Sequence, residues 1–123
     1  MRIKITIDDK VFEADLYETP TGKAIYDALP FESDSHTWGD EIYFGAPVHT
    51  ALEPDARAQV EVGDLGYWPS MPAFCLFFGP TPVSTSNAPQ AASEVNVFGK
   101  LVKVDLELLR SVGDGQNVII SKA

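Results

Sequence analysis

The fold is decided by residues 65–78, which read Leu65-Gly-Tyr-Trp-Pro-Ser-Met-Pro-Ala-Phe-Cys-Leu-Phe-Phe78. Residues 65–68 are typical of a strand, residues 69–72 of a turn, and residues 73–78 of a second strand. Every residue of the second strand is apolar, which is typical of a strand that is covered on both faces. We therefore expect residues 73–78 to form a central strand of a sheet.

The flanking sequence predicts further strands and two short helices. Alternating or short apolar runs predict strands over residues 2–7, 11–16, 31–38, 41–44, 59–62, 95–104 and 116–121. The N-cap residues Thr19 and Asp105 predict helices over residues 19–29 and 106–112, with Pro20 in the first turn of the first helix. The apolar pattern of residues 95–104 changes phase beside Gly99, which favours a β-bulge.

These elements predict a mostly β protein. We expect about eight strands and two short helices to form a closed eight-stranded β-barrel, because closure leaves no exposed sheet edge. Residues 79–93 are rich in Pro, Ser, Thr and Ala and predict a long loop, of a kind that usually binds a ligand or is disordered. At 123 residues the chain has the length of one domain, which we place at residues 1–123.

The chain is acidic. It has 18 Asp and Glu residues against 9 Lys and Arg residues, which gives a formal net charge of −9. Because phosphates would be repelled, neither a nucleic acid nor an anionic membrane is expected as a partner. The single cysteine, Cys75, excludes an internal disulfide, and its apolar neighbours favour a small buried hydrophobic residue.

No targeting or membrane segment is predicted. The first residues alternate and carry charge, whereas a secretory signal has an apolar run of about 7–15 residues after its basic start. The longest apolar run, residues 73–78, is far below the roughly 20 residues that a membrane helix needs. We expect a soluble, cytoplasmic protein.

Three segments resemble one family of small proteins. They are Val60-Glu-Val-Gly-Asp-Leu-Gly-Tyr-Trp-Pro-Ser-Met-Pro-Ala-Phe-Cys-Leu-Phe-Phe-Gly-Pro-Thr-Pro82, Gly39-Asp-Glu-Ile-Tyr-Phe44 and Asn96-Val-Phe-Gly-Lys100. In order and spacing they are similar to segments of small prokaryotic cyclophilin-like proteins, a family first catalogued as a domain of unknown function. The resemblance covers most of residues 39–104, and it implies an eight-stranded β-barrel capped by two helices.

The resemblance implies no catalytic residue. True cyclophilins catalyse prolyl cis–trans isomerisation with a Phe-His-Arg triplet on one strand, and this chain has no such triplet. Likeness of fold does not by itself carry a function.

Aromatic residues near the quoted run are the candidate ligand-binding groups. Phe74, Phe77 and Phe78 are expected to fill the barrel, because aromatic residues dominate protein cores. Strand alternation places Tyr67 and Trp68 on opposite faces, so the one that faces outward is the better candidate, and the pattern favours Trp68. We expect an apolar groove bordered by the 79–93 loop. Its candidate residues are Trp68, Tyr67, Phe78, Thr81 and Asn87.

Few other residues suggest a site. The two histidines, His36 and His49, lie thirteen positions apart with no cysteine partner, and we predict no metal and no cofactor. Arg57 is a candidate catalytic residue, because in a prolyl isomerase an arginine hydrogen-bonds the proline nitrogen as amide resonance is lost. A surface ion pair of Arg57 with Asp55 or Glu53 is the alternative interpretation.

The leading hypothesis is a protein that binds a small molecule or peptide in an apolar groove, without established catalysis. One alternative is a divergent peptidyl-prolyl cis–trans isomerase. Another is an accessory subunit of a larger amide or urea-derivative hydrolase, because cyclophilin-like barrels also occur in such enzymes. A protein partner or a homodimer is compatible with each of these hypotheses.

Overall fold

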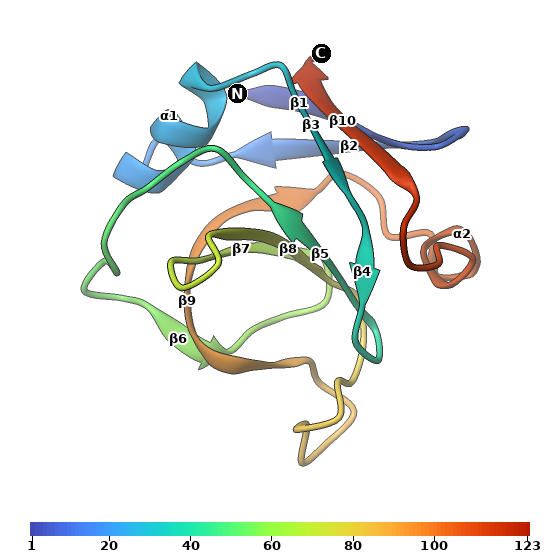
Figure 1. The fold of residues 1–123 in the computed structure, drawn as a ribbon. Coiled ribbons are helices and arrows are strands. Elements are labelled where there is room, and N and C mark those ends of the chain that lie inside the picture. Colours follow the sequence, from blue (N-terminus) through green and yellow to red (C-terminus); the bar gives the residue numbers. More distant parts are fainter.

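The chain folds around one ten-stranded antiparallel sheet, and the computed structural model describes all residues 1–123 (Figure 1). The strands are β1 (Arg2–Ile7), β2 (Lys10–Leu16), β3 (Phe31–Asp34), β4 (His36–Thr37), β5 (Glu41–Gly45), β6 (Arg57–Gln59), β7 (Asp64–Trp68), β8 (Ala73–Phe77), β9 (Gln90–Leu101) and β10 (Asn117–Lys122). The helices are α1 (Pro20–Asp27) and α2 (Leu106–Arg110). The prediction of a mostly β protein with two short helices is confirmed.

The sheet curls back on itself, but hydrogen bonds do not close it. Its strands follow the order β3-β10-β1-β2-β9-β7-β8-β5-β4, with β6 paired to β9. The two ends of this order, β3 and β4, are consecutive in the chain and separated only by Ser35. The predicted closed eight-stranded barrel is therefore corrected to ten strands in a curled sheet without a closing ladder.

The bonds of Ser35 explain why the predicted strand over residues 31–38 is interrupted. The backbone N–H of Ser35 donates to the carbonyl oxygen of Gln116 at 2.9 Å, and its hydroxyl donates to the carbonyl oxygen of Gly113 at 2.7 Å. The N–H of Gln116 donates back to the Ser35 Oγ at 3.0 Å. Because these bonds tie Ser35 to the turn before β10, this residue is not available to a sheet ladder.

Both helices begin at the predicted caps. The side-chain oxygen of Thr19 accepts from the N–H of Gly22 at 3.1 Å, and that of Asp105 accepts from the N–H of Leu108 at 3.1 Å. These bonds satisfy N–H groups that have no partner within a helix. Both helices end two residues earlier than predicted. Neither helix has the length and apolar content to cross a membrane.

The main core lies on the concave face of the sheet. It is a cluster of 23 buried hydrophobic residues, to which β1, β2, β5, β7, β8 and β10 contribute alternate side chains. A second, smaller cluster lies on the convex face. Its members are Val60, Ala73, Cys75, Phe77, Ala91 and Val95. Strand β8 supplies residues to both clusters, as its uniformly apolar sequence predicts.

The convex cluster is covered by Val60, which follows β6, and by Ala91 and Val95 in the first half of β9. Strand β9 is twelve residues long and curves from its ladder with β7 to its ladder with β6 (Figure 1). Its register against β7 shifts between Gly99 and Val97, so the predicted bulge beside Gly99 is confirmed. The strand predicted over 95–104 ends at Leu101, and two further predicted boundaries are wrong. Residues 90–93 belong to β9 rather than to a loop, and the strand predicted over 59–62 is observed as Arg57–Gln59.

Asn96 fastens the long connection between β5 and β6 to the rest of the chain. Its Oδ1 accepts from the N–H of Glu53 at 2.7 Å, and its Nδ2 donates to the carbonyl oxygen of Ala51 and to the Thr21 hydroxyl, each at 3.0 Å. Thr21 in turn donates to the Glu53 carboxylate from both its N–H and its hydroxyl. The Asn96 amide therefore holds α1, β9 and the 46–56 segment together.

Asn96→Ala should destabilise the protein by about 1–3 kcal/mol, because it leaves the Glu53 N–H and the Ala51 carbonyl oxygen without this partner and removes the bond to the buried Thr21 hydroxyl. The free energy of unfolding in urea, followed by circular dichroism, measures this change. Asn87→Ala is the matched control, because Asn87 is exposed, and it should shift stability by no more than about 0.5 kcal/mol. Equal stabilities of the two variants would contradict the role given to Asn96.

Candidate functional site

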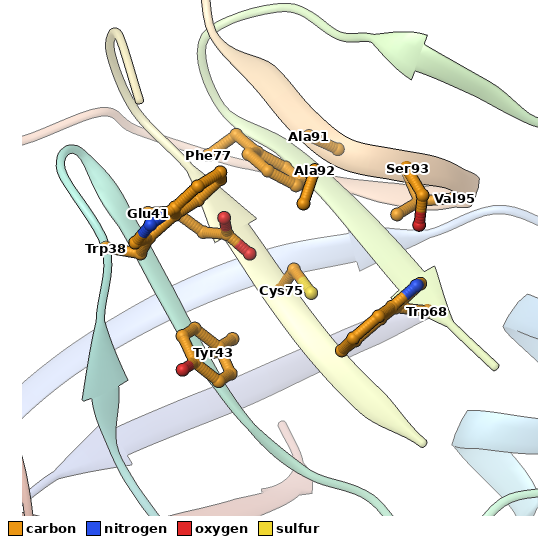
Figure 2. Close-up of a pocket in the computed structure, with 10 residues that line it drawn as sticks. All are labelled: Trp38, Glu41, Tyr43, Trp68, Cys75, Phe77, Ala91, Ala92, Ser93 and Val95. Carbon is orange, nitrogen blue, oxygen red and sulfur yellow. The ribbon is translucent and has the colours of Figure 1, made fainter. Parts of the chain in front are cut away.

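A pocket opens on the convex face of the sheet beside the smaller cluster (Figure 2). Its volume is about 190 Å³, and eight of its ten lining residues are hydrophobic. The lining residues are Trp38, Glu41, Tyr43, Trp68, Cys75, Phe77, Ala91, Ala92, Ser93 and Val95. Strands β5, β7 and β8 form its floor, and β9 forms one wall.

Two small residues, Gly66 and Cys75, lie side by side beneath the pocket. Across the convex face, Tyr43 of β5 pairs with Cys75 of β8, and Cys75 pairs with Gly66 of β7. A Cβ atom on Gly66 would lie 3.0 Å from the Phe77 ring and 2.9 Å from Val95. Gly66 therefore leaves room for the Phe77 ring and for Val95, and a larger residue there would displace one of them.

A tight turn brings Trp38 and Glu41 to the same edge of the pocket. The N–H of Trp38 donates to the carbonyl oxygen of Glu41 at 2.9 Å, and the N–H of Glu41 donates back at 3.2 Å. Two residues that exchange both bonds carry their side chains on the same face of a sheet. Gly39 makes the turn possible with a φ of +59°.

Trp68 lies on the opposite side of the pocket from Trp38. It is the last residue of β7, and Figure 2 shows Glu41 and Cys75 between the two indole rings. Both tryptophans are partly exposed, and they are the only two in the chain. The Tyr43 ring lines the pocket from β5 and is stacked on His36, with 5.2 Å between the ring centroids.

Glu41 is the one charged residue in the pocket lining. Only 7% of its surface is exposed, and its carboxylate points toward Cys75 (Figure 2). Burial raises the pKa of Glu41 from 4.5 to about 7, and the Cys75 thiol offsets part of this rise by donating to the carboxylate. A carboxyl group with this pKa exchanges a proton near neutral pH.

Cys75 is a neutral thiol in this setting. Burial, together with the neighbouring Glu41 carboxylate, raises its pKa well above the usual value. Because the thiolate is the nucleophilic form, Cys75 is a weak hydrogen-bond donor and packing group here rather than an activated nucleophile.

The structure separates the residues that the sequence suggested for a ligand site. Trp68 lines the pocket. Tyr67 faces the main core, where its hydroxyl donates to the carbonyl oxygen of Val48 at 2.6 Å, and Phe78 also packs in that core. Thr81 is buried, and its hydroxyl donates to the carbonyl oxygen of Gln90, so it orders the loop. Asn87 is exposed on that loop and does not line the pocket.

Arg57 lies in a different cleft from Trp68. Its cleft is polar, has a volume of about 440 Å³ and is lined by residues of the 57–61 and 85–90 segments. Arg57 is exposed, and its guanidinium donates to the carbonyl oxygen of Asp55 at 3.4 Å. No group of three or more His, Cys, Asp and Glu side chains converges anywhere in the chain.

Sequence reasoning missed most of the pocket lining. It did not select Trp38, Glu41 or Tyr43 for ligand binding, and it placed Phe77 inside the barrel, whereas Phe77 belongs to the convex cluster. The alternation of side chains along a strand would have predicted two of these lining residues. Glu41 and Tyr43 alternate with the core residues Ile42 and Phe44, so they must lie on the other face.

Comparison with known proteins identifies the family. The model of a protein family described as cyclophilin-like matches residues 1–121. The chain belongs to the cyclophilin-like family. A hypothetical protein of Archaeoglobus fulgidus, known from a solution structure, is 43% identical to this cyclophilin-like chain, with a TM-score of 0.84 over 100% of this chain and 95% of that one. The predicted membership of a small cyclophilin-like family is confirmed.

A more distant structure shares only the fold. McbB, solved in complex with tryptophan, is 13% identical to this cyclophilin-like chain, with a TM-score of 0.72. The alignment covers 98% of this chain and 44% of McbB. A search of curated proteins gave no match.

The raised pKa of Glu41 makes stability depend on pH. Because the folded chain binds this proton more tightly than the unfolded chain, the stabilisation is fully present below about pH 4.5 and is lost as the pH rises to about 7. Relative to Glu41→Gln, the free energy of unfolding of the wild type should fall by up to about 3 kcal/mol across this range. Urea denaturation from pH 4.5 to pH 8 measures it.

Glu18→Gln is the matched control for this measurement, because Glu18 is exposed and does not line the pocket. Its stability should follow that of the wild type at every pH. If Glu41→Gln also follows the wild type, burial does not perturb the Glu41 carboxyl group.

Proposed function

We propose that this cyclophilin-like protein binds a small molecule with one flat apolar ring in the pocket between Trp38 and Trp68. The observation that carries the proposal is the combination of a mostly apolar lining with one buried carboxylate. Ligand sites are typically concave and apolar, with a few polar groups that orient the ligand.

The dimensions of the pocket favour a small molecule over a peptide. A cavity of roughly 150 Å³ admits a benzene ring, and this pocket measures about 190 Å³. The indole rings of Trp38 and Trp68 and the phenol ring of Tyr43 offer faces for stacking. A single ring with a short substituent matches this space, whereas a peptide would extend well beyond it.

One structure with this fold was solved with a small molecule. McbB, of which 44% aligns with this chain, was solved in complex with tryptophan, a small molecule with a flat ring system. The Archaeoglobus fulgidus relative is described as hypothetical and adds no information on a ligand.

The two other hypotheses find less support. A prolyl isomerase of the cyclophilin type needs a cationic donor beside an apolar slot, and the pocket lining contains no arginine or lysine. Arg57 lies in the separate polar cleft. The accessory-subunit hypothesis stays a prediction, and co-purification with a larger enzyme from the native cell would favour it.

Tryptophan fluorescence tests the proposed binding directly. Because both tryptophans line the pocket, the whole tryptophan signal of the chain comes from this site. Titration with small ring compounds should change the emission in a saturable way. Ala92→Phe should weaken binding at least about tenfold, because Ala92 is exposed in the lining and a phenyl group there obstructs the pocket. Trp68→Ala should weaken it by a similar factor, because one stacking face is lost.

Two control variants test whether the loss of binding is specific to the pocket lining. Ala51→Phe makes the same change at an exposed position outside the lining, and Tyr67→Phe alters the neighbour of Trp68 on the core face. Both should bind as the wild type does. A flat titration for every compound, or equal binding by Ala92→Phe and Ala51→Phe, would refute the proposal.

A protease-coupled assay on an Xaa-Pro peptide tests the isomerase alternative. We expect no acceleration over the uncatalysed reaction, which takes tens to hundreds of seconds, because no cation borders the pocket. Acceleration that disappears in Arg57→Ala would reinstate the isomerase hypothesis and move the site to the polar cleft.

A further inference from the structure

The carboxylate of Glu41 lacks a cationic partner within the chain. The ion pairs of the structure involve Arg2, Lys10, Lys100 and Arg110, and none of them reaches Glu41. The adjacent Asp40, by contrast, pairs with Arg110 at 3.0 Å. The turn therefore points one acidic side chain at a cation and the next one into the pocket.

Such a carboxylate is costly to bury unless something binds it. An isolated charge in apolar surroundings either takes up a proton or needs a strong hydrogen-bond donor or a cation. The Cys75 thiol is the donor that faces Glu41, and a thiol is a weak donor. The Glu41 carboxylate is therefore a hydrogen-bond acceptor in the pocket, and the chain supplies only the weak Cys75 thiol as its donor.

The surroundings of Glu41 favour a cationic ligand group over a neutral or anionic one. Trp38 stands beside the carboxylate, and Tyr43 and Trp68 complete an aromatic rim (Figure 2). Aromatic faces attract ammonium groups through their negative quadrupole. The net charge of −9 adds a field that concentrates cations and repels anions.

We propose that the ligand of this pocket is a small arylalkyl amine, whose ammonium group binds the Glu41 carboxylate while its ring lies between Trp38 and Trp68. This inference rests on the proposed function and specifies its ligand class. A charge-assisted hydrogen bond from the ammonium to Glu41 satisfies the carboxylate. The ring fills the apolar part of the pocket near Phe77 and Ala92.

Three probes of nearly equal size separate charge from shape. They are 2-phenylethylamine, 2-phenylethanol and 3-phenylpropionate, which at pH 8 are cationic, neutral and anionic. Binding is measured by tryptophan fluorescence excited at 295 nm and by calorimetry at pH 8. The wild type should bind the amine at least about tenfold more tightly than the alcohol, and the carboxylate least tightly.

Glu41→Gln removes the charge with little change of shape. In this variant the preference for the amine over the alcohol should fall below about threefold. Glu18→Gln is the matched control, because it changes the net charge equally at an exposed position outside the lining. It should keep the full preference, which distinguishes the local carboxylate from the overall field.

The outcomes separate this inference from the proposed function. Saturable binding of all three probes with equal affinity, or tightest binding of the alcohol or the carboxylate, overturns the amine inference and leaves the ring-binding pocket intact. Loss of the preference in Glu18→Gln as well as in Glu41→Gln also overturns it, since the overall charge would then be responsible. If no probe binds to the wild type, both proposals fail.

Discussion

Strand β8 is covered on both faces, and two separate parts of the chain have to supply that cover. The concave face packs into the main core, which the curled sheet itself encloses. The convex face needs Val60, which follows β6, and residues from the first half of β9. This need explains the length and curvature of β9, because one strand must pair with β7 at one end and with β6 at the other. Apolar surface on both faces of one strand thus fixes the architecture around it.

The pocket follows from incomplete filling of the convex face. Small residues such as Gly66, Cys75 and Ala91 leave space there, whereas large side chains fill the concave face. Glu41 departs from the apolar pattern of that face, and its burial costs stability at neutral pH. Local departures of this kind are expected where a protein binds or reacts, since folding alone would favour an apolar residue.

The sequence predicted local features better than long-range ones. Thr19 and Asp105 located both helix starts, because a cap depends only on residues within one turn. The phase change beside Gly99 located the bulge in β9 for a similar reason. The absence of a closing ladder between β3 and β4 was not predictable, because Ser35 between them bonds to a turn about eighty positions away. Of the candidate ligand residues, only Trp68 lines the pocket. It was predicted from strand alternation, which places it on the face opposite to Tyr67.

The sequence by itself determined where most of the strands lie, which residues cap the helices, and that residues 73–78 require cover on both sides. These properties follow from the spacing and chemistry of neighbouring residues. Only the tertiary structure decided which apolar face becomes a core and which leaves a pocket, and it alone brought Trp38, Glu41 and Cys75 together with Trp68. The physical reason is that three strands and a distant wall enclose the pocket, so its shape depends on how far segments separated in the chain can approach each other.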